Sequence, residues 1–282
     1  MTLAEPAVIR FAPSPSGYLH LGHAYSALFS WAQAQKLNGR FLLRIEDIDT
    51  TRCRKSFEEA IYTDLKWLGL KWEEPVRIQS RHMDDYKGAL QRLDDKNLIY
   101  PCFCTRKEIQ AEILRSGKAP HGPEGHIYPG ICRNLSSAQS EEKITLGQSY
   151  ALRLKMDKAI DLTGPLTWQD LAVGTIEATP ERFGDVVLAR KDINTSYHLS
   201  VTIDDALQNV NCVTRGKDLF EATHIHRLLQ ALLELPVPTW HHHDLICDEK
   251  GNRLAKRHNA LAIRELRERG HSPQEVAAMA GI

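Results

Sequence analysis

The sequence lacks any apolar run long enough to cross a bilayer, and residues 1–10 lack the basic start and apolar core of a signal peptide. It also lacks an excess of charge, because 36 Lys and Arg residues balance 36 Asp and Glu residues. A protein that binds many phosphates is usually basic overall, so this balance neither requires nor excludes nucleic acid and makes any such contact local. With 42% hydrophobic residues, we expect a globular protein of the cytoplasm without a membrane partner.

Cysteine is scarce, with six among 282 residues. Cys53, Cys212 and Cys247 are scattered along the chain. In a reducing compartment such cysteines are small core side chains by default, and we expect that role for these three.

The other three cysteines cluster around a loop rich in Pro, Gly and His. Cys102 and Cys104 precede this loop and Cys132 follows it. Three thiols flanking a poorly cored hairpin are typical of a tetrahedral zinc site that holds the hairpin together. Imidazole is the commoner fourth ligand, and the loop offers His121 and His126. Unpaired structural thiols are the alternative.

A Pro- and Gly-rich loop near the N-terminus joins a predicted strand, residues 7–12, to a helical pattern that opens at His23. The start of a helix after such a turn offers free backbone N–H groups and a positive dipole end to a phosphate. Gly22 lets a ligand approach the backbone, and His20 and His23 can donate hydrogen bonds to phosphoryl oxygens. The alternative is an ordinary helix start with satisfied imidazoles.

The chain then alternates strands and helices. Residues 39–46 read as a second strand, and residues 55–68 and 82–97 read as amphipathic helices, so a parallel sheet is expected. Ligands bind beyond the carboxyl ends of such strands. Glu46 lies at that end and is expected to face the same cleft as the histidines, although an acidic residue there can simply cap the next turn.

Residues 101–193 interrupt the alternation and are interpreted as an inserted subdomain, with a half-buried strand at 150–155. Residues 194–235 resume it, with strands expected at 197–205 and 210–215 and a helix at 220–234.

This arrangement puts Tyr197 and Arg215 near strand ends on the same side of the sheet as Arg10. Arginine pairs with carboxylates bidentately, so these positions suit an acidic ligand. A surface ion pair is the alternative for Arg215.

The last stretch, residues 236–282, carries a basic loop that ends in Arg253-Leu254-Ala255-Lys256-Arg257 and then a basic helix. Three histidines, His241 to His243, precede this loop. Neighbouring residues of a strand point to opposite faces, so we interpret the three as ordinary strand residues rather than as metal ligands.

Taken in order, these motifs resemble those of class I aminoacyl-tRNA synthetases of the glutamyl branch. The resemblance rests on the loop from Arg10 to His23, on Arg-Ile-Glu-Asp-Ile-Asp ending at Asp49, and on Asp204-Asp205 followed by Arg215-Gly216-Lys217-Asp218 and the loop around Lys256. The chain is most similar to the short glutamyl-queuosine tRNA(Asp) synthetase family, because it ends soon after that loop and leaves no room for a helical anticodon-binding domain.

The resemblance also bears on the zinc site. The family pattern Cys-x-Cys…Tyr-x-x-x-Cys includes a tyrosine ligand, which moves the expected fourth ligand to Tyr128. The segment between Cys104 and Tyr128 is long, so His126 stays open.

The family implies a Rossmann-type α/β catalytic domain, with halves at 1–100 and 194–235, a zinc-bearing insertion at 101–193, and a short helical segment at 236–282. It implies that ATP with Mg²⁺ activates L-glutamate without tRNA, and that a monomer transfers glutamate to queuosine in the tRNA(Asp) anticodon. Matching catalytic and ATP-binding positions are His20, Gly22, His23 and Lys256, and matching glutamate positions are Arg10, Ser14, Glu46, Tyr197 and Arg215.

Ala255 departs from the family motif, because it lacks a hydroxyl that could donate a hydrogen bond to a phosphate. This departure bears on how fast the loop around Lys256 works, rather than on whether it works. Three alternatives are the catalytic core of an ordinary glutamyl-tRNA synthetase, another nucleotidyltransferase class built on the same His-x-Gly-His turn, and a degenerate paralogue that only binds RNA.

Overall fold

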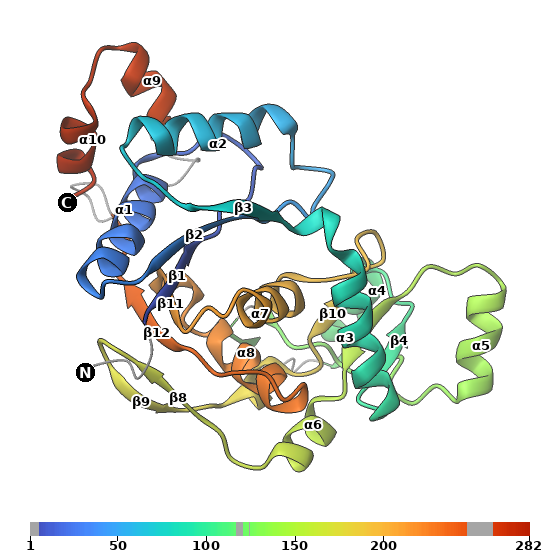
Figure 1. Ribbon diagram of the computed structural model, residues 1–282. Coiled ribbons are helices and arrows are strands. Elements are labelled where there is room, and N and C mark those ends of the chain that lie inside the picture. The colour runs from blue at the N-terminus through green and yellow to red at the C-terminus, as the bar shows by residue number, and fades with distance from the viewer. Residues whose placement is uncertain (1–5, 117–120, 124, 247–261) are drawn as a thin grey trace.

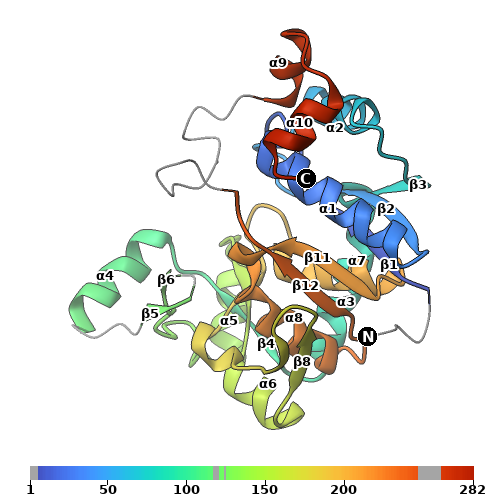
Figure 2. The same ribbon diagram turned by 90° about the vertical axis from the view of Figure 1, so that its left-hand side faces the viewer.

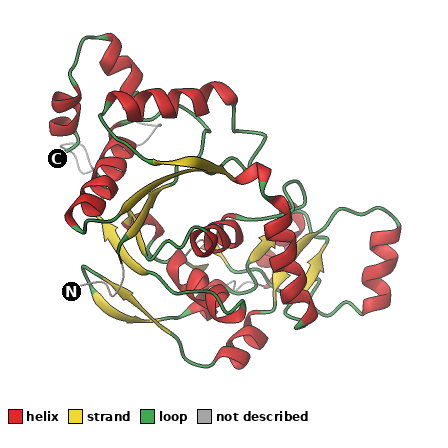
Figure 3. Ribbon diagram, in the orientation of Figure 1, coloured by secondary structure: helices red, strands yellow, loops and turns green. Residues whose placement is uncertain are grey.

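The computed structural model describes residues 6–116, 121–123, 125–246 and 262–282, in which strands and helices alternate (Figure 3). The strands are β1 (Val8–Phe11), β2 (Arg40–Ile45), β3 (Glu73–Ile78), β4 (Ile99–Cys102), β5 (His121–Gly122), β6 (Gly125–His126), β7 (Ala151–Leu154), β8 (Thr167–Asp170), β9 (Gly174–Glu177), β10 (Val187–Ala189), β11 (Cys212–Gly216) and β12 (Thr239–His243). The α-helices are α1 (Leu21–Lys36), α2 (Lys55–Trp67), α3 (Met83–Asp95), α4 (Arg106–Ser116), α5 (Ser137–Thr145), α6 (Met156–Thr163), α7 (Tyr197–Leu207), α8 (Ala222–Leu232), α9 (Ile263–Glu268) and α10 (Pro273–Met279).

Parallel strands form the centre of the molecule (Figure 1). Strands β1, β2 and β3 pair in parallel, and β11, β12 and β8 form a second parallel set that β9 extends in the antiparallel sense. The two sets adjoin at Asn211, whose side chain accepts a hydrogen bond from the Val8 amide at 2.8 Å. The predicted α/β class with parallel strands is therefore confirmed.

A separate antiparallel sheet consists of β4, which begins at Ile99, and of two strands within residues 101–193. Its order is β10-β7-β4, and the hairpin of β5 and β6 projects with α4 from the body of the molecule (Figure 2). Strands β8 and β9 fall in the same range but join the sheet of β11 and β12. The boundaries expected for an insertion remain a prediction.

The helices cover the central strands through apolar contacts. One core cluster joins α1, β1, β2 and α2 and extends to Ile263, Leu266 and Val276 in the last two helices. Arg267 of α9 also pairs with buried Asp64 of α2 at 2.8 Å. The C-terminal helices are thus packed beside α1 and α2, as both views show (Figures 1 and 2). In the described ranges, no helix is long and apolar enough to cross a membrane.

Two local expectations are corrected by the structure. Residues 197–207 form α7 rather than a strand, and the Ser196 hydroxyl caps this helix by accepting from the Leu199 amide at 3.4 Å. Every residue from His198 to Asp205 is buried, so the segment has no polar face and its sequence resembles a buried strand. Helix α1 begins at Leu21, two residues earlier than expected, because His20 is its N-cap.

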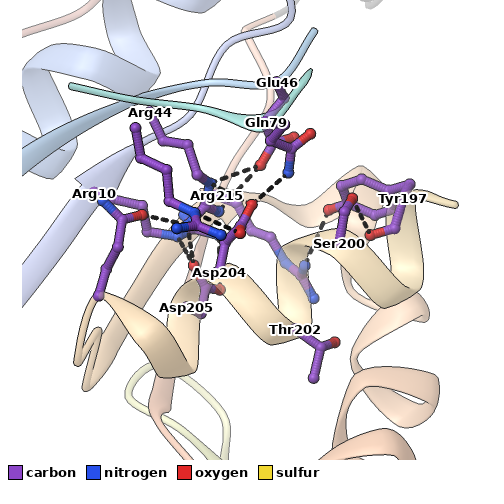
Figure 4. A network of polar contacts seen from close by, with 12 residues as sticks. Arg10, Arg44, Glu46, Gln79, Tyr197, Ser200, Thr202, Asp204, Asp205 and Arg215 are labelled. Carbon is purple, nitrogen blue, oxygen red and sulfur yellow. Dashed lines mark hydrogen bonds and ion pairs between the residues drawn. The ribbon is translucent and has the colours of Figure 1, made fainter. Parts of the chain in front are cut away.

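A buried charge network fixes α7 against the first two strands (Figure 4). Asp205 accepts from Arg10 Nε at 2.9 Å and from Arg44 Nη1 at 2.8 Å. Arg44 is fully buried and also donates to Glu46 at 3.0 Å. Because a buried charge is costly without a partner, these four groups constrain one another, and Asp205 joins three separate elements.

We expect Asp205→Ala to lower the free energy of unfolding by about 3–5 kcal/mol, since Arg10 and Arg44 lose a shared buried partner. Urea denaturation followed by circular dichroism measures this loss. Leu207→Ala is the matched control on the same helix, because Leu207 is 54% exposed. That substitution should change stability by about 0.5 kcal/mol or less. Equal effects of the two substitutions would contradict the role given to Asp205.

Candidate active site

A cavity of about 370 Å³ opens at the carboxyl ends of β1, β2 and β11, beside the start of α1. Its lining includes every residue predicted for the nucleotide and amino-acid sites that the structure describes: Arg10, Ser14, His20, Gly22, His23, Glu46, Tyr197 and Arg215. Lys256 lies outside the described residues. The fold therefore brings together side chains that are up to 205 positions apart in the sequence.

The two histidines of the first loop form the cap of α1. His20 Nδ1 accepts from the Gly22 amide at 3.1 Å, and His23 Nδ1 accepts from the His20 amide at 3.2 Å. An imidazole that accepts at Nδ1 carries its proton at Nε2 when neutral. Each ring can thus act as an Nε2–H donor at a helix N-terminus, where the backbone also favours an anion.

Glu46 is one of three acidic residues that line the cavity, with Asp218 and Asp244. Its carboxylate accepts from Arg44, and 13% of its side chain is exposed. Burial raises the pKa of Glu46, although the charges of Arg44 and Arg10 oppose this rise. A cationic group that entered the cavity could add a second charge partner to this carboxylate.

Two arginines, Arg10 and Arg215, line the same cavity, and they differ in whether a carboxylate of the protein pairs with them (Figure 4). The Arg10 charge is matched by Asp205. Arg215, only 5% exposed, donates instead to neutral groups, among them the Tyr197 hydroxyl at 3.2 Å and the Thr223 hydroxyl at 2.6 Å. Burial lowers the pKa of Arg215, and no ion pair links it to a carboxylate among the described residues. This cation is chemically suited to receive an anionic ligand.

Ser14 and Tyr197 complete the predicted set. The Ser14 hydroxyl lies 3.5 Å from the Cys53 sulfur. Tyr197 is the first residue of α7, so a helix start and not a strand end presents it to Arg215. Burial raises the pKa of the Tyr197 hydroxyl, which keeps it a neutral hydrogen-bonding group.

The described residues on either side of 247–261 lie beside the cavity. Ile246 lines the cavity, and Ala262 forms an isolated bridge with His20. The Ile263 amide also donates to the Leu19 carbonyl at 2.8 Å. Both flanks of the basic loop therefore lie at the predicted nucleotide site.

A second group of side chains could hold a metal ion. The sulfurs of Cys102, Cys104 and Cys132 lie within 4.8 Å of one another. The Tyr128 hydroxyl is 3.3 Å from the Cys102 sulfur and 3.4 Å from that of Cys104, whereas His126 is exposed on β6. Tetrahedral zinc with sulfur ligands at about 2.3 Å needs sulfurs roughly 3.8 Å apart, so the donor set fits this metal.

Sequence reasoning missed several residues behind the cavity. Arg44 and Asp205 lie in quoted motifs but received no role, and His226 was not singled out. His242 lies on a strand as predicted, but its contact with Arg215, from whose Nε it accepts at 3.1 Å, was not foreseen. For Arg44 the available signal was a charged side chain inside the apolar run Phe41-Leu42-Leu43-Arg44-Ile45.

Known proteins are similar to this chain in sequence and in fold. A model of the family described as tRNA synthetases class I (E and Q), catalytic domain, matches residues 6–281. A glutamyl-Q tRNA(Asp) synthetase of Rhodobacter capsulatus is 48% identical over 98% of this chain and 100% of its own length. A glutamate–tRNA ligase of Aquifex aeolicus is 39% identical over 94% of this chain and 54% of its own.

Solved structures agree with the sequence matches. A glutamate tRNA ligase of Elizabethkingia meningosepticum, in complex with its amino acid, has a TM-score of 0.76 and 28% identity, and the match covers 95% of this chain and 54% of that one. The chain thus spans about half the length of the glutamate–tRNA ligases that it matches. It belongs to the ligases of the class I tRNA synthetase family (E and Q), in the group of the glutamyl-Q tRNA(Asp) synthetases.

Proposed function

We propose that this protein activates L-glutamate with ATP, without tRNA, and transfers it to the queuosine base in the anticodon of tRNA(Asp). The observation that carries the proposal is the charge layout of the cavity. Arg215 is a buried cation with neutral partners, Arg10 is a second cation, and Glu46 is an anion in the same space. Glutamate offers the complement, with two carboxylates and one ammonium group.

Each pocket group then has one task in amino-acid binding. Glu46 takes the ammonium group, and Arg10 and Arg215 share the two carboxylates. Ser14 and Tyr197 line the same space and offer hydroxyl groups. Glutamine would leave an arginine in the cavity without its charge partner, so the site discriminates by charge.

The first reaction step forms an adenylate. An α-carboxylate oxygen of glutamate attacks the α-phosphorus of ATP in line, and the bond to pyrophosphate breaks as the new bond forms. His20 and His23 donate Nε2–H groups to the charge that develops on the phosphoryl oxygens, and Mg²⁺ accompanies the ATP phosphates. Lys256 would add a further positive charge, and the positions of Ile246 and Ala262 support this role.

In the second step a hydroxyl oxygen of the RNA attacks the carbonyl carbon of glutamyl-adenylate. The ester forms as the bond to the phosphate oxygen breaks, AMP leaves, and the hydroxyl proton passes to the phosphate of the departing AMP. Queuosine carries a cyclopentenediol whose adjacent cis hydroxyls resemble the ribose diol of a terminal adenosine, so a cleft built for one could accept the other. The comparison with relatives supports queuosine. The Rhodobacter relative named for glutamyl-Q tRNA(Asp) is 48% identical to this chain, whereas the Aquifex glutamate–tRNA ligase is 39% identical.

We also propose that Cys102, Cys104, Cys132 and Tyr128 hold one structural zinc ion. Zinc would cross-link β4 to the loop that follows β6, two segments that share only a small apolar cluster. Arg153 supports an anionic site, because its guanidinium lies 3.8 Å from the centre of the Tyr128 ring. Although burial opposes it, hydrogen bonds from Tyr128 and Arg153 lower the pKa of the Cys102 thiol.

Purified protein should contain one zinc ion per chain by elemental analysis. Tyr128→Phe removes the hydroxyl without emptying the space, so it should weaken zinc retention during a chelator titration. His126→Ala is the matched control and should retain zinc like the unaltered chain. The reverse order would assign the fourth ligand to His126, and protein free of zinc would refute the site.

The protein should catalyse glutamate-dependent ATP–pyrophosphate exchange in the absence of RNA. Glutamine should be at least roughly 100-fold poorer in kcat/KM, because an unpaired buried arginine costs about 3–5 kcal/mol. Lys256→Ala should slow exchange by roughly 10²–10³-fold, the effect of one transition-state charge partner. Lys87→Ala, at an exposed position of α3, serves as the control. Comparable rates with both amino acids would contradict the proposed pocket.

Radiolabelled glutamate should be attached to queuosine-containing tRNA(Asp) and not to queuosine-free tRNA(Asp) or tRNA(Glu). A queuosine-containing anticodon stem-loop should also become labelled, although it has no amino-acid-accepting 3′ end. Label on tRNA(Glu) would instead favour the core of an ordinary glutamyl-tRNA synthetase. Absence of exchange and of labelling would favour a paralogue that only binds RNA.

A further inference from the structure

A shell of imidazole groups lies behind Arg215. Its Nε atom is 3.1 Å from His242 Nε2, and its Nη1 atom is 3.2 Å from His226 Nδ1. These histidines come from β12 and α8, and each is at most 3% exposed. Neither is needed to contact ATP or glutamate in the proposed reaction, so their burial beside the substrate arginine needs another explanation.

The protons on these rings follow from the chemistry of arginine. A guanidinium group can only donate, so His242 Nε2 and His226 Nδ1 must both accept. The His242 proton therefore sits on Nδ1, which faces the Asp170 carboxylate at 2.7 Å. The His226 proton sits on Nε2, which faces His198 Nδ1 at 3.3 Å. Each ring is thus held in one tautomer from both sides.

The rings are neutral because their surroundings penalise a second positive charge. Burial and the Arg215 charge lower the pKa of His242 to about 4, and that of His226 falls well below its usual range. The Asp170 charge is taken up by the His242 ring and by the backbone amides of Ala172, at 2.8 Å, and Val173, at 3.2 Å. Arg215 is therefore hydrogen-bonded to neutral acceptors, and the His242 ring separates it from the Asp170 carboxylate.

We infer that His226 and His242 are positioning residues that set the specificity for a carboxylate ligand. They satisfy Arg215 N–H groups without neutralising its charge, so the full positive charge remains for the substrate. A carboxylate at either position would form an internal ion pair and compete with the ligand. The inference rests on the proposed function, since it takes glutamate as the ligand that Arg215 receives.

Asp170 acts on Arg215 indirectly, through its contact with His242. An ionised carboxylate can only accept, and this property keeps the proton on His242 Nδ1. An amide at position 170 could donate to Nδ1 and move the proton to Nε2, where it would face the Arg215 Nε–H group. Asp170 lies on β8, so the strand that pairs with β12 also fixes the tautomer of its histidine.

The test uses two variants of similar shape. His226→Asn keeps a neutral acceptor near the position of Nδ1, and His226→Asp places a carboxylate there. We expect His226→Asp to raise the KM for glutamate in pyrophosphate exchange by roughly 10–100-fold, the value of a charged hydrogen bond. His226→Asn should stay within about threefold of the unaltered chain, and Gln148→Glu, at an exposed position, controls for added charge.

The pair His242→Gln and His242→Glu repeats the comparison at the second ring. A merely structural role for these histidines predicts similar losses for the neutral and the acidic variant, together with similar falls in melting temperature. Equal KM values within each pair would overturn the inference.

Calorimetric binding of glutamate without ATP separates this inference from the proposed function. Binding that the acidic variants lose and the amide variants retain, in a protein without exchange activity, would support the inference and refute the proposed reaction. Exchange activity with equal KM values for the two variants of each pair would support the proposed reaction and refute the inference. A chain that does not bind glutamate would overturn both.

Discussion

The double ion pair of Asp205 with Arg10 and Arg44 is the interaction on which the rest of the site depends. One carboxylate on a helix accepts from an arginine on each of two neighbouring strands, and the second arginine passes the constraint on to Glu46. None of these groups can move alone, because each would leave a buried charge unpaired. The pocket is therefore held in shape by charge balance as well as by apolar packing.

This balance divides the work between two arginines. Arg10 belongs to the internal network, in which Asp205 and the Thr214 carbonyl accept from its guanidinium group. Arg215 stands outside the network and is surrounded by hydroxyl and imidazole groups. A protein interior tolerates such a cation only when its N–H groups are well satisfied, and this requirement accounts for the histidines packed behind it.

Much of the nucleotide loop could be predicted because its signals are local. The strand before Arg10, the turn and the start of α1 follow from short-range patterns. Helix α7 was mistaken for a strand because burial on all sides removes the polar face that marks a helix. The role of His242 depends on Asp170, 72 positions away, and on Arg215, so nothing in the neighbouring sequence could reveal it. Tyr128 was proposed as the fourth zinc ligand only through family resemblance, since imidazole is the commoner ligand.

The pairing of β8 with β12 limits how modular the molecule is. Between β7 and β10 of the antiparallel sheet, the chain enters the sheet of β11 and β12 at Thr167, and Asp170 then contacts His242 behind Arg215 of the cavity. An exchange of the peripheral region between relatives must therefore leave β8 and β9 with the catalytic half. A graft that ended near residue 194, where the strand–helix alternation resumes, would carry Asp170 away with the peripheral region and leave His242 without this partner.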